Sequence, residues 1–174
     1  MMILQRIFFI LLLGYSALFA KNIEVVPPSI SFKSSLEADI IEDIYMTIHN
    51  GIGTYNAQQD NPSKLLHVKE TFLPTKKYKT QLRNYYRKSS LRDKMLYMQK
   101  HHLSYLLEYR IKHSDIRRIR GTKNIYKVRM QLYVFTKDGK YKRFKTKLYF
   151  DTKIYALTDK SYNRITKLVL QALR

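Results

Sequence analysis

The chain has 174 residues, and 33 Lys plus Arg against 13 Asp plus Glu give it a formal net charge of +20 at pH 7. Hydrophobic residues make up 45% of the sequence, too much for an intrinsically disordered polyelectrolyte, so we expect one packed domain. Cysteine is absent, which excludes disulfides, thiolate metal sites, a cysteine nucleophile and a lipid-anchoring cysteine.

The first twenty residues have the pattern of a secretory signal. Arg6 precedes an apolar run over residues 7–13, and small residues follow up to Ala20. The run is shorter than the ~20 residues that span a bilayer. We predict a cleavable signal peptide over residues 1–20 and a single periplasmic α+β domain over residues 21–174. An uncleaved inner-membrane anchor is the alternative, and it also places the domain outside the cytoplasm.

Short extended segments are predicted on both sides of the first helix of the domain. Residues 23–26 form a strand that ends at Pro27, because proline cannot donate a ladder hydrogen bond. A second extended segment is expected at 30–32, and another strand at 65–73.

An amphipathic helix is predicted from Ser34 to about Asn50. Ser34 and Glu37 form a capping box, and we expect the helix to give way to a loop at Gly51 and Gly53. The apolar stripe consists of Leu36, Ile40, Ile41, Ile44, Tyr45 and Ile48.

Two shorter helices are predicted next. One begins at Pro74 and ends before Ser89, with Tyr78, Leu82, Tyr85 and Tyr86 on one face. The other is capped by Ser90 and ends near His101, and its apolar stripe is Leu91, Met95 and Met98.

The pattern from residue 103 onward predicts three antiparallel strands, at residues 103–113, 126–135 and 141–154, and a helix that begins at Thr158. Residues 114–124 are expected to form a polar connection. The fold class that follows is α+β, a two-layer sandwich with a mostly antiparallel sheet of four to five strands, and with two main helices and a short helical pair on one face. The apolar positions are Leu103, Tyr105, Leu107, Tyr109 and Ile111 in the first strand, Phe144, Leu148, Phe150 and Ile154 in the third, and Tyr162, Ile165, Leu168, Val169 and Ala172 in the helix.

The turn between the last two strands determines their register. A two-residue Asp138-Gly139 turn would place Arg129 opposite Leu148 and mix charged with apolar side chains on both faces. A three-residue turn with Gly139 in the left-handed conformation places Arg129 opposite Lys147 and Val128 opposite Leu148. We therefore predict the second register, with one apolar face and one basic, tyrosine-rich face.

The positive charge is concentrated in the middle of the chain. Residues 64–147 contain 25 basic and 5 acidic residues, a net of +20, whereas four acidic residues cluster in the first helix. The folded molecule should therefore have an uneven distribution of charge. The basic sheet face has two explanations: cations protect exposed strands from edge-to-edge pairing, or they bind an anion or a partner. The candidate partner- or anion-binding residues are Lys127, Arg129, Arg143, Lys145, Lys147, Tyr133, Tyr149, Arg117, Arg118 and Arg120, and the acidic cluster is Glu37, Asp39, Glu42 and Asp43.

Signals for catalysis are weak. The five histidines lack the spacing of a metal-binding pair on one helix, and the sequence contains neither a phosphate-binding Gly-Lys-Ser/Thr loop nor a Gly-x-Ser-x-Gly nucleophile motif. We therefore expect no catalytic residue, no metal and no cofactor. Nucleic acid would fit the mixture of cations and aromatic rings, but export argues against it. The histidines are His49, His67, His101, His102 and His113.

The order of predicted elements resembles a group of small envelope domains. Residues 104–107 (Ser-Tyr-Leu-Leu), after a short helix, resemble the Asp-Tyr-Leu-Leu-Gly strand of that group, and residues 136–140 (Thr-Lys-Asp-Gly-Lys) resemble its hairpin turn. The group includes the periplasmic domain of the curli secretion channel, activators of penicillin-binding proteins, the N-terminal domain of TolB and flagellar ring proteins. Glu108 stands where the group has glycine, and the lipid-anchor cysteine is missing.

The resemblance implies a non-catalytic module that docks on other envelope proteins. We therefore expect a periplasmic scaffold or accessory protein of an envelope machine, with the flagellar motor periphery, a secretion complex or a wall-synthesis complex as candidates. The alternative is a binder of an anionic envelope ligand such as lipopolysaccharide or an anionic lipid, similar to the small lipoprotein that plugs the lipopolysaccharide transport barrel. The sequence leaves the oligomeric state open.

Overall fold

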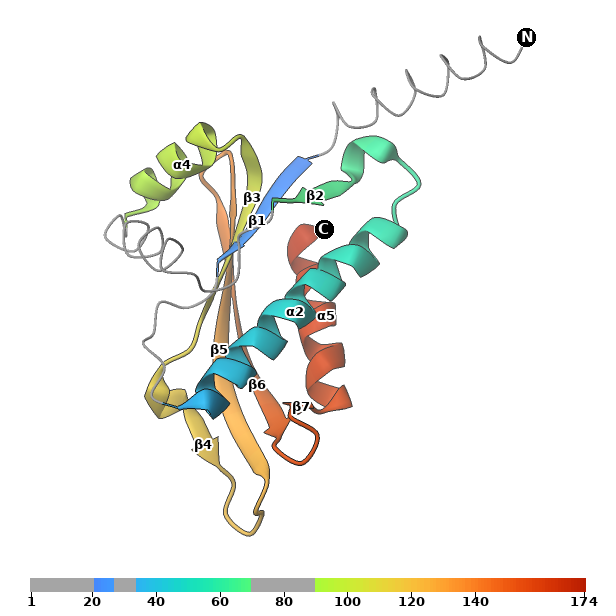
Figure 1. Cartoon of the computed structure of the whole chain (residues 1–174). Coiled ribbons are helices and arrows are strands. Elements are labelled where there is room, and N and C mark those ends of the chain that lie inside the picture. The colour runs from blue at the N-terminus through green and yellow to red at the C-terminus, as the bar shows by residue number, and fades with distance from the viewer. Residues whose placement is uncertain (1–20, 27–33, 70–89) are drawn as a thin grey trace, which may run out of the picture.

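The computed structural model describes residues 21–26, 34–69 and 90–174. Within them, one mixed seven-stranded sheet carries α2 (Ser35–Ala57) and α5 (Asp159–Leu173) on one face and α4 (Leu91–Lys100) on the other (Figure 1). The α+β class is confirmed. The sheet is larger than the predicted four to five strands, and α4 does not share a face with the two long helices. The extended segment expected at 30–32 and the helix expected from Pro74 lie outside the described residues.

The strands follow the order β2-β1-β3-β5-β6-β7, and β4 pairs with β5 beyond the end of β3. The pairing of β1 with β2 and with β3 is parallel, whereas the other pairs are antiparallel. Short 3-10 turns occur at Pro62–Lys64 and His113–Asp115. The strands are β1 (Lys21–Val26), β2 (Leu66–Val68), β3 (Leu103–Arg110), β4 (Ile116–Arg118), β5 (Ile125–Thr136), β6 (Tyr141–Asp151) and β7 (Ala156–Leu157).

Helix α2 begins where the sequence predicts, because the Ser34 side chain accepts a hydrogen bond from the Glu37 backbone N–H. The loop expected at Gly51 is wrong, since the helix continues to Ala57. Tertiary packing explains the difference: a Cβ at Gly51 would lie 3.1 Å from the Cβ of Val169 in α5. A glycine here lets the two helices approach closely, and this close packing outweighs its low helix propensity.

The hairpin register is confirmed. Gly139 has φ +81°, the Thr136 N–H donates to the Lys140 carbonyl, and Arg129 lies opposite Lys147 while Val128 lies opposite Leu148. The side chains of β5 and β6 therefore sort into an apolar face toward α2 and α5 and a basic face on the other side of the sheet.

Several local predictions near the sheet ends are wrong. Ile154 was expected in the core but is 65% exposed, because the chain leaves the sheet after Asp151 and turns before β7. In α5, Ser161 is buried instead of Tyr162, and its Oγ accepts a hydrogen bond from the backbone N–H of Tyr149. The polar connection at 114–124 contains β4, and of the strand expected at 65–73 the described residues form only Leu66–Val68.

Two apolar clusters hold the sheet and helices together. The larger one lies between the sheet and the two long helices, and it includes fully buried Ile44, Ile48, Leu132, Phe150 and Val169. The smaller one lies under α4 on the opposite face and consists of Val26, Met98, Leu103, Leu106 and Phe135. The basic face thus shares its side of the sheet with the smaller cluster.

The close approach of α2 and α5 can be tested at the two glycines of α2. We expect Gly51→Leu to lower the free energy of unfolding by about 1–3 kcal/mol, because the new side chain meets Val169. Gly53 has no heavy atom within 4 Å of its would-be Cβ, so Gly53→Ala should raise the unfolding free energy by up to ~1 kcal/mol. Chemical denaturation measures both changes, and a Gly51→Leu variant as stable as the original protein would contradict this account of the helix pair.

Candidate docking surface

The basic face is the part of the sheet that carries cations in adjacent rows. Arg129 of β5 lies opposite Lys147 of β6. Lys127 of β5 lies between Arg117 of β4 and Tyr149 of β6. We use the name basic face for Arg117, Lys127, Arg129, Arg143, Lys145 and Lys147, which the register places on one side of the sheet.

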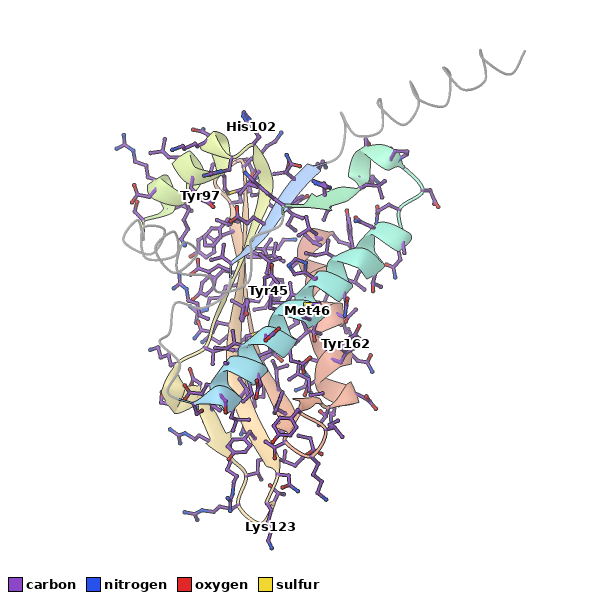
Figure 2. The ribbon with its side chains drawn as sticks, viewed as in Figure 1. Tyr45, Met46, Tyr97, His102, Lys123 and Tyr162 are labelled. Atoms are coloured by element: carbon purple, nitrogen blue, oxygen red, sulfur yellow. The ribbon has the colours of Figure 1, made fainter. Side chains whose placement is uncertain are left out.

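The other predicted site residues take different positions. Tyr133 and Tyr149 are half-buried and share the side of the basic face. Arg118 of β4 lies opposite Tyr126 of β5, which in turn lies opposite the buried Phe150 of β6. Arg118 is therefore on the side of the sheet opposite to the basic face. Arg120 is exposed in the loop between β4 and β5. Lys123, in the same loop, marks the end of the molecule beyond the sheet (Figure 2).

The cations of the basic face have few anionic neighbours. In the described part of the chain, Arg129, Lys145 and Lys147 are exposed and form no salt bridge. Asp151 lies at the far end of the same side, where its carboxylate accepts a hydrogen bond from the Lys153 backbone N–H at 2.8 Å. Because paired strands are only about 4.8 Å apart, neighbouring cations repel one another and create a strong local positive potential.

An aromatic contact borders the basic face. The guanidinium of Arg110 lies 4.4 Å from the ring centroid of Tyr133, and that of Arg143 lies 5.9 Å from it. The Tyr133 hydroxyl donates to the Gln131 side-chain oxygen at 2.8 Å. These contacts hold both arginines over one ring. Sequence reasoning missed Arg110, because its place beside Tyr133 follows from the pairing of β3 with β5, which no local pattern reveals.

Under α4 the charge is compensated instead. Glu108 is fully buried, and its carboxylate accepts from Lys94 Nζ at 2.5 Å and from Arg110 Nε at 2.6 Å. The Lys94 ammonium also lies 4.8 Å from the Phe135 ring centroid. The predicted stripe of α4 is therefore partly wrong: Lys94 and Met98 are buried, whereas Leu91 is exposed.

A second polar contact fixes α4 to the sheet. The Tyr97 hydroxyl donates to the buried carboxylate of Glu24 in β1, at 2.9 and 3.1 Å from its two oxygens. Burial, and then the negative charge of Glu24, raise the pKa of Tyr97 above its ordinary value. The phenol therefore keeps its proton and donates even well above neutral pH. Within the described residues, α4 covers one end of this side of the sheet and no helix packs on the basic face.

The acidic cluster of α2 has at least one structural role. The half-buried Asp43 carboxylate accepts a hydrogen bond from the backbone N–H of Leu157 at 2.5 Å, which ties β7 to α2. In the residues that the structure describes, no group of three or more His, Asp or Glu side chains could hold a metal ion. No described helix has the length and hydropathy needed to cross a membrane.

Comparisons with known proteins give only distant likenesses. No family model and no curated protein matches the sequence. Among solved structures, a PelC dodecamer from Paraburkholderia phytofirmans is similar with a TM-score of 0.44 and 11% identity, over 89% of this chain and 86% of that one. A protein from Caulobacter crescentus described as a lipoprotein has a TM-score of 0.22 and 15% identity, over 48% and 69% of the two chains. Both TM-scores are below 0.5, so neither likeness assigns a function.

The buried ion pair predicts a strong effect of removing one partner. We expect Glu108→Leu to lower the free energy of unfolding by about 3–5 kcal/mol, because it leaves the Lys94 ammonium buried without its counter-charge. The double variant Lys94→Met with Glu108→Leu should recover most of this loss, since it removes both charges. Denaturant titration measures the three stabilities. A double variant no more stable than the single one would show that the pair is not what makes Glu108 essential.

Proposed function

We propose that this chain is an exported, non-enzymatic accessory protein of a bacterial envelope complex and that it docks on an acidic partner through the basic face. The observation that supports this most directly is the set of exposed cations without salt-bridge partners in the described residues, above all Arg129, Lys145 and Lys147. Like charges opposite one another on a sheet are destabilising by roughly 0.2–1 kcal/mol per pair. A partner that supplies carboxylates removes this repulsion.

The position of the basic face also favours docking over simple solubility. Cations occupy adjacent rows on one side of β4, β5 and β6, while α2 carries the acidic cluster on a helix of the other sheet face. Such a charge distribution orients an approaching partner before contact.

The location rests on the sequence. Residues 1–20 have the pattern of an export signal, and an exported basic protein meets acidic envelope proteins and anionic envelope ligands. The flagellar motor periphery, a secretion complex and a wall-synthesis complex are the candidate machines. Lipopolysaccharide offers the same negative charge and is the competing ligand that the experiment below distinguishes.

Docking is tested by neutralising the basic face in living cells. A photo-crosslinking amino acid in place of Gln131, at the centre of the face, should capture an envelope protein. The combined change of Arg129, Arg143, Lys145 and Lys147 to Gln should lower the crosslinked fraction about tenfold or more, because each exposed charge contributes about 0.2–1 kcal/mol. The crosslink should also weaken as salt rises, since screening acts within about 8 Å at physiological ionic strength.

The matched control removes the same amount of charge elsewhere. Lys21, Lys64, Lys160 and Lys167 are exposed and lie outside the basic face, and their combined change to Gln should leave the crosslink intact. Equal crosslinking by both quadruple variants would contradict the proposal. If the crosslinker captured lipopolysaccharide and no protein, the basic face would bind the anionic ligand instead of an envelope protein.

A further inference from the structure

The outer edge of β6 has a row of backbone groups for which the described residues supply no partner. In the β5–β6 ladder the even-numbered residues of β6 face β5, as the Thr136 N–H to Lys140 carbonyl bond at the turn shows. The odd-numbered residues therefore direct their N–H and C=O groups away from β5. At the far end these groups are occupied: the Tyr149 N–H donates to Ser161 Oγ, the Tyr149 carbonyl accepts from the Thr158 N–H, and the Lys147 carbonyl accepts from Arg164.

In the part of the chain that the structure describes, the edge is open from Tyr141 to the N–H of Lys147. β7 pairs only with Phe150 and Asp151, and in the described residues nothing bonds the outward groups of Tyr141, Arg143 and Lys145 or the outward N–H of Lys147. The open stretch is about 20 Å long at ~3.4 Å per residue, enough for a strand of six or seven residues.

We propose that this edge accepts an extended acidic segment of the partner as an additional strand, so that the basic face and the strand edge act together. This inference rests on the proposed function and names the form that the partner takes there. Side chains of an added strand alternate between the two sheet faces. Those on one face would lie beside Arg143, Lys145 and Lys147. Those on the other would lie beside half-buried Phe144 and Thr146, with exposed Lys142 only at the turn end. The segment that fits therefore alternates acidic and apolar residues.

Charge disfavours the simplest competing occupant, a second copy of β6. Pairing of two such edges would place the row Arg143, Lys145 and Lys147 against the same row of the other copy, and like charges opposite one another are destabilising. An acidic strand turns each of these contacts into an attraction. Backbone N–H and C=O groups that repeat every second residue are also matched by an extended polypeptide rather than by a sugar chain or a lipid headgroup.

The test separates backbone pairing from charge at one residue. Lys145→Pro removes the outward N–H and puts the proline ring on the open edge, yet it removes no hydrogen bond to β5. Lys145→Gln removes the same charge and keeps the N–H. The probe is an acetylated heptapeptide of alternating Glu and Val, and fluorescence anisotropy measures its affinity. We expect Lys145→Gln to weaken binding about threefold and Lys145→Pro at least about tenfold.

Hydrogen exchange on the unsubstituted protein gives a readout that needs no variant. The peptide should slow amide exchange at Tyr141, Arg143, Lys145 and Lys147, whereas the even-numbered amides of β6 are already bonded to β5. A heptapeptide of alternating Lys and Val should not bind.

Three results would overturn the inference. Equal affinities of the Lys145→Pro and Lys145→Gln variants would show that charge alone holds the peptide, and docking on the basic face would stand without strand addition. The edge inference also fails if the acidic peptide does not bind, or if β6 edges pair in a dimer that Lys145→Pro abolishes. The quadruple Gln variant in living cells tests the proposed function separately.

Discussion

The separation of charge from core in this molecule depends on one turn. The left-handed conformation of Gly139 makes the β5–β6 connection three residues long, and the two strands then alternate in phase. A connection one residue shorter would place Arg129 opposite Leu148, and one of the two strands would have to direct its cations toward α2 and α5. Burial of even one unpaired cation costs several kcal/mol, so no alternative register competes. The core and the basic face are two consequences of the same geometry.

Glu108 determines where the basic face ends. Its carboxylate pairs with Lys94 from α4 and Arg110 from its own strand, and together with the buried Glu24 it brings the sum of these four charges beneath α4 to zero. Farther from α4, past Tyr133, the described residues include no buried carboxylate that could pair with the cations of β5 and β6. A helix could cover the neutral end because a paired charge can be buried, whereas covering the basic end would need additional acids. In the described part of the chain, the position of α4 on the sheet therefore follows the distribution of buried carboxylates.

Features that depend on neighbours in sequence were predictable. The serine caps of α2 and α4, the alternation along β5 and the turn at Gly139 all involve residues a few positions apart, and each was predicted correctly. Features that depend on distant contacts were not. Gly51 has the signature of a loop until Val169 is known to pack against it, and Lys94 has the signature of a solvated residue until Glu108 is known to face it. For the same reason, Arg110 was not among the predicted site residues and the parallel pairing of β1 was not predicted.

Strand β6 satisfies two requirements that usually oppose each other. An open edge invites pairing with any extended chain, and natural proteins protect such edges with lysine and other charged residues. Here Arg143 and Lys145 provide that protection, because they repel a second copy of the same strand. The repulsion depends only on the sign of the charge, so a chain of opposite sign is attracted by the same residues. Protection against self-association and the proposed selection of an acidic partner are therefore the same electrostatic property acting on two kinds of chain, and the two explanations of the basic face do not exclude each other.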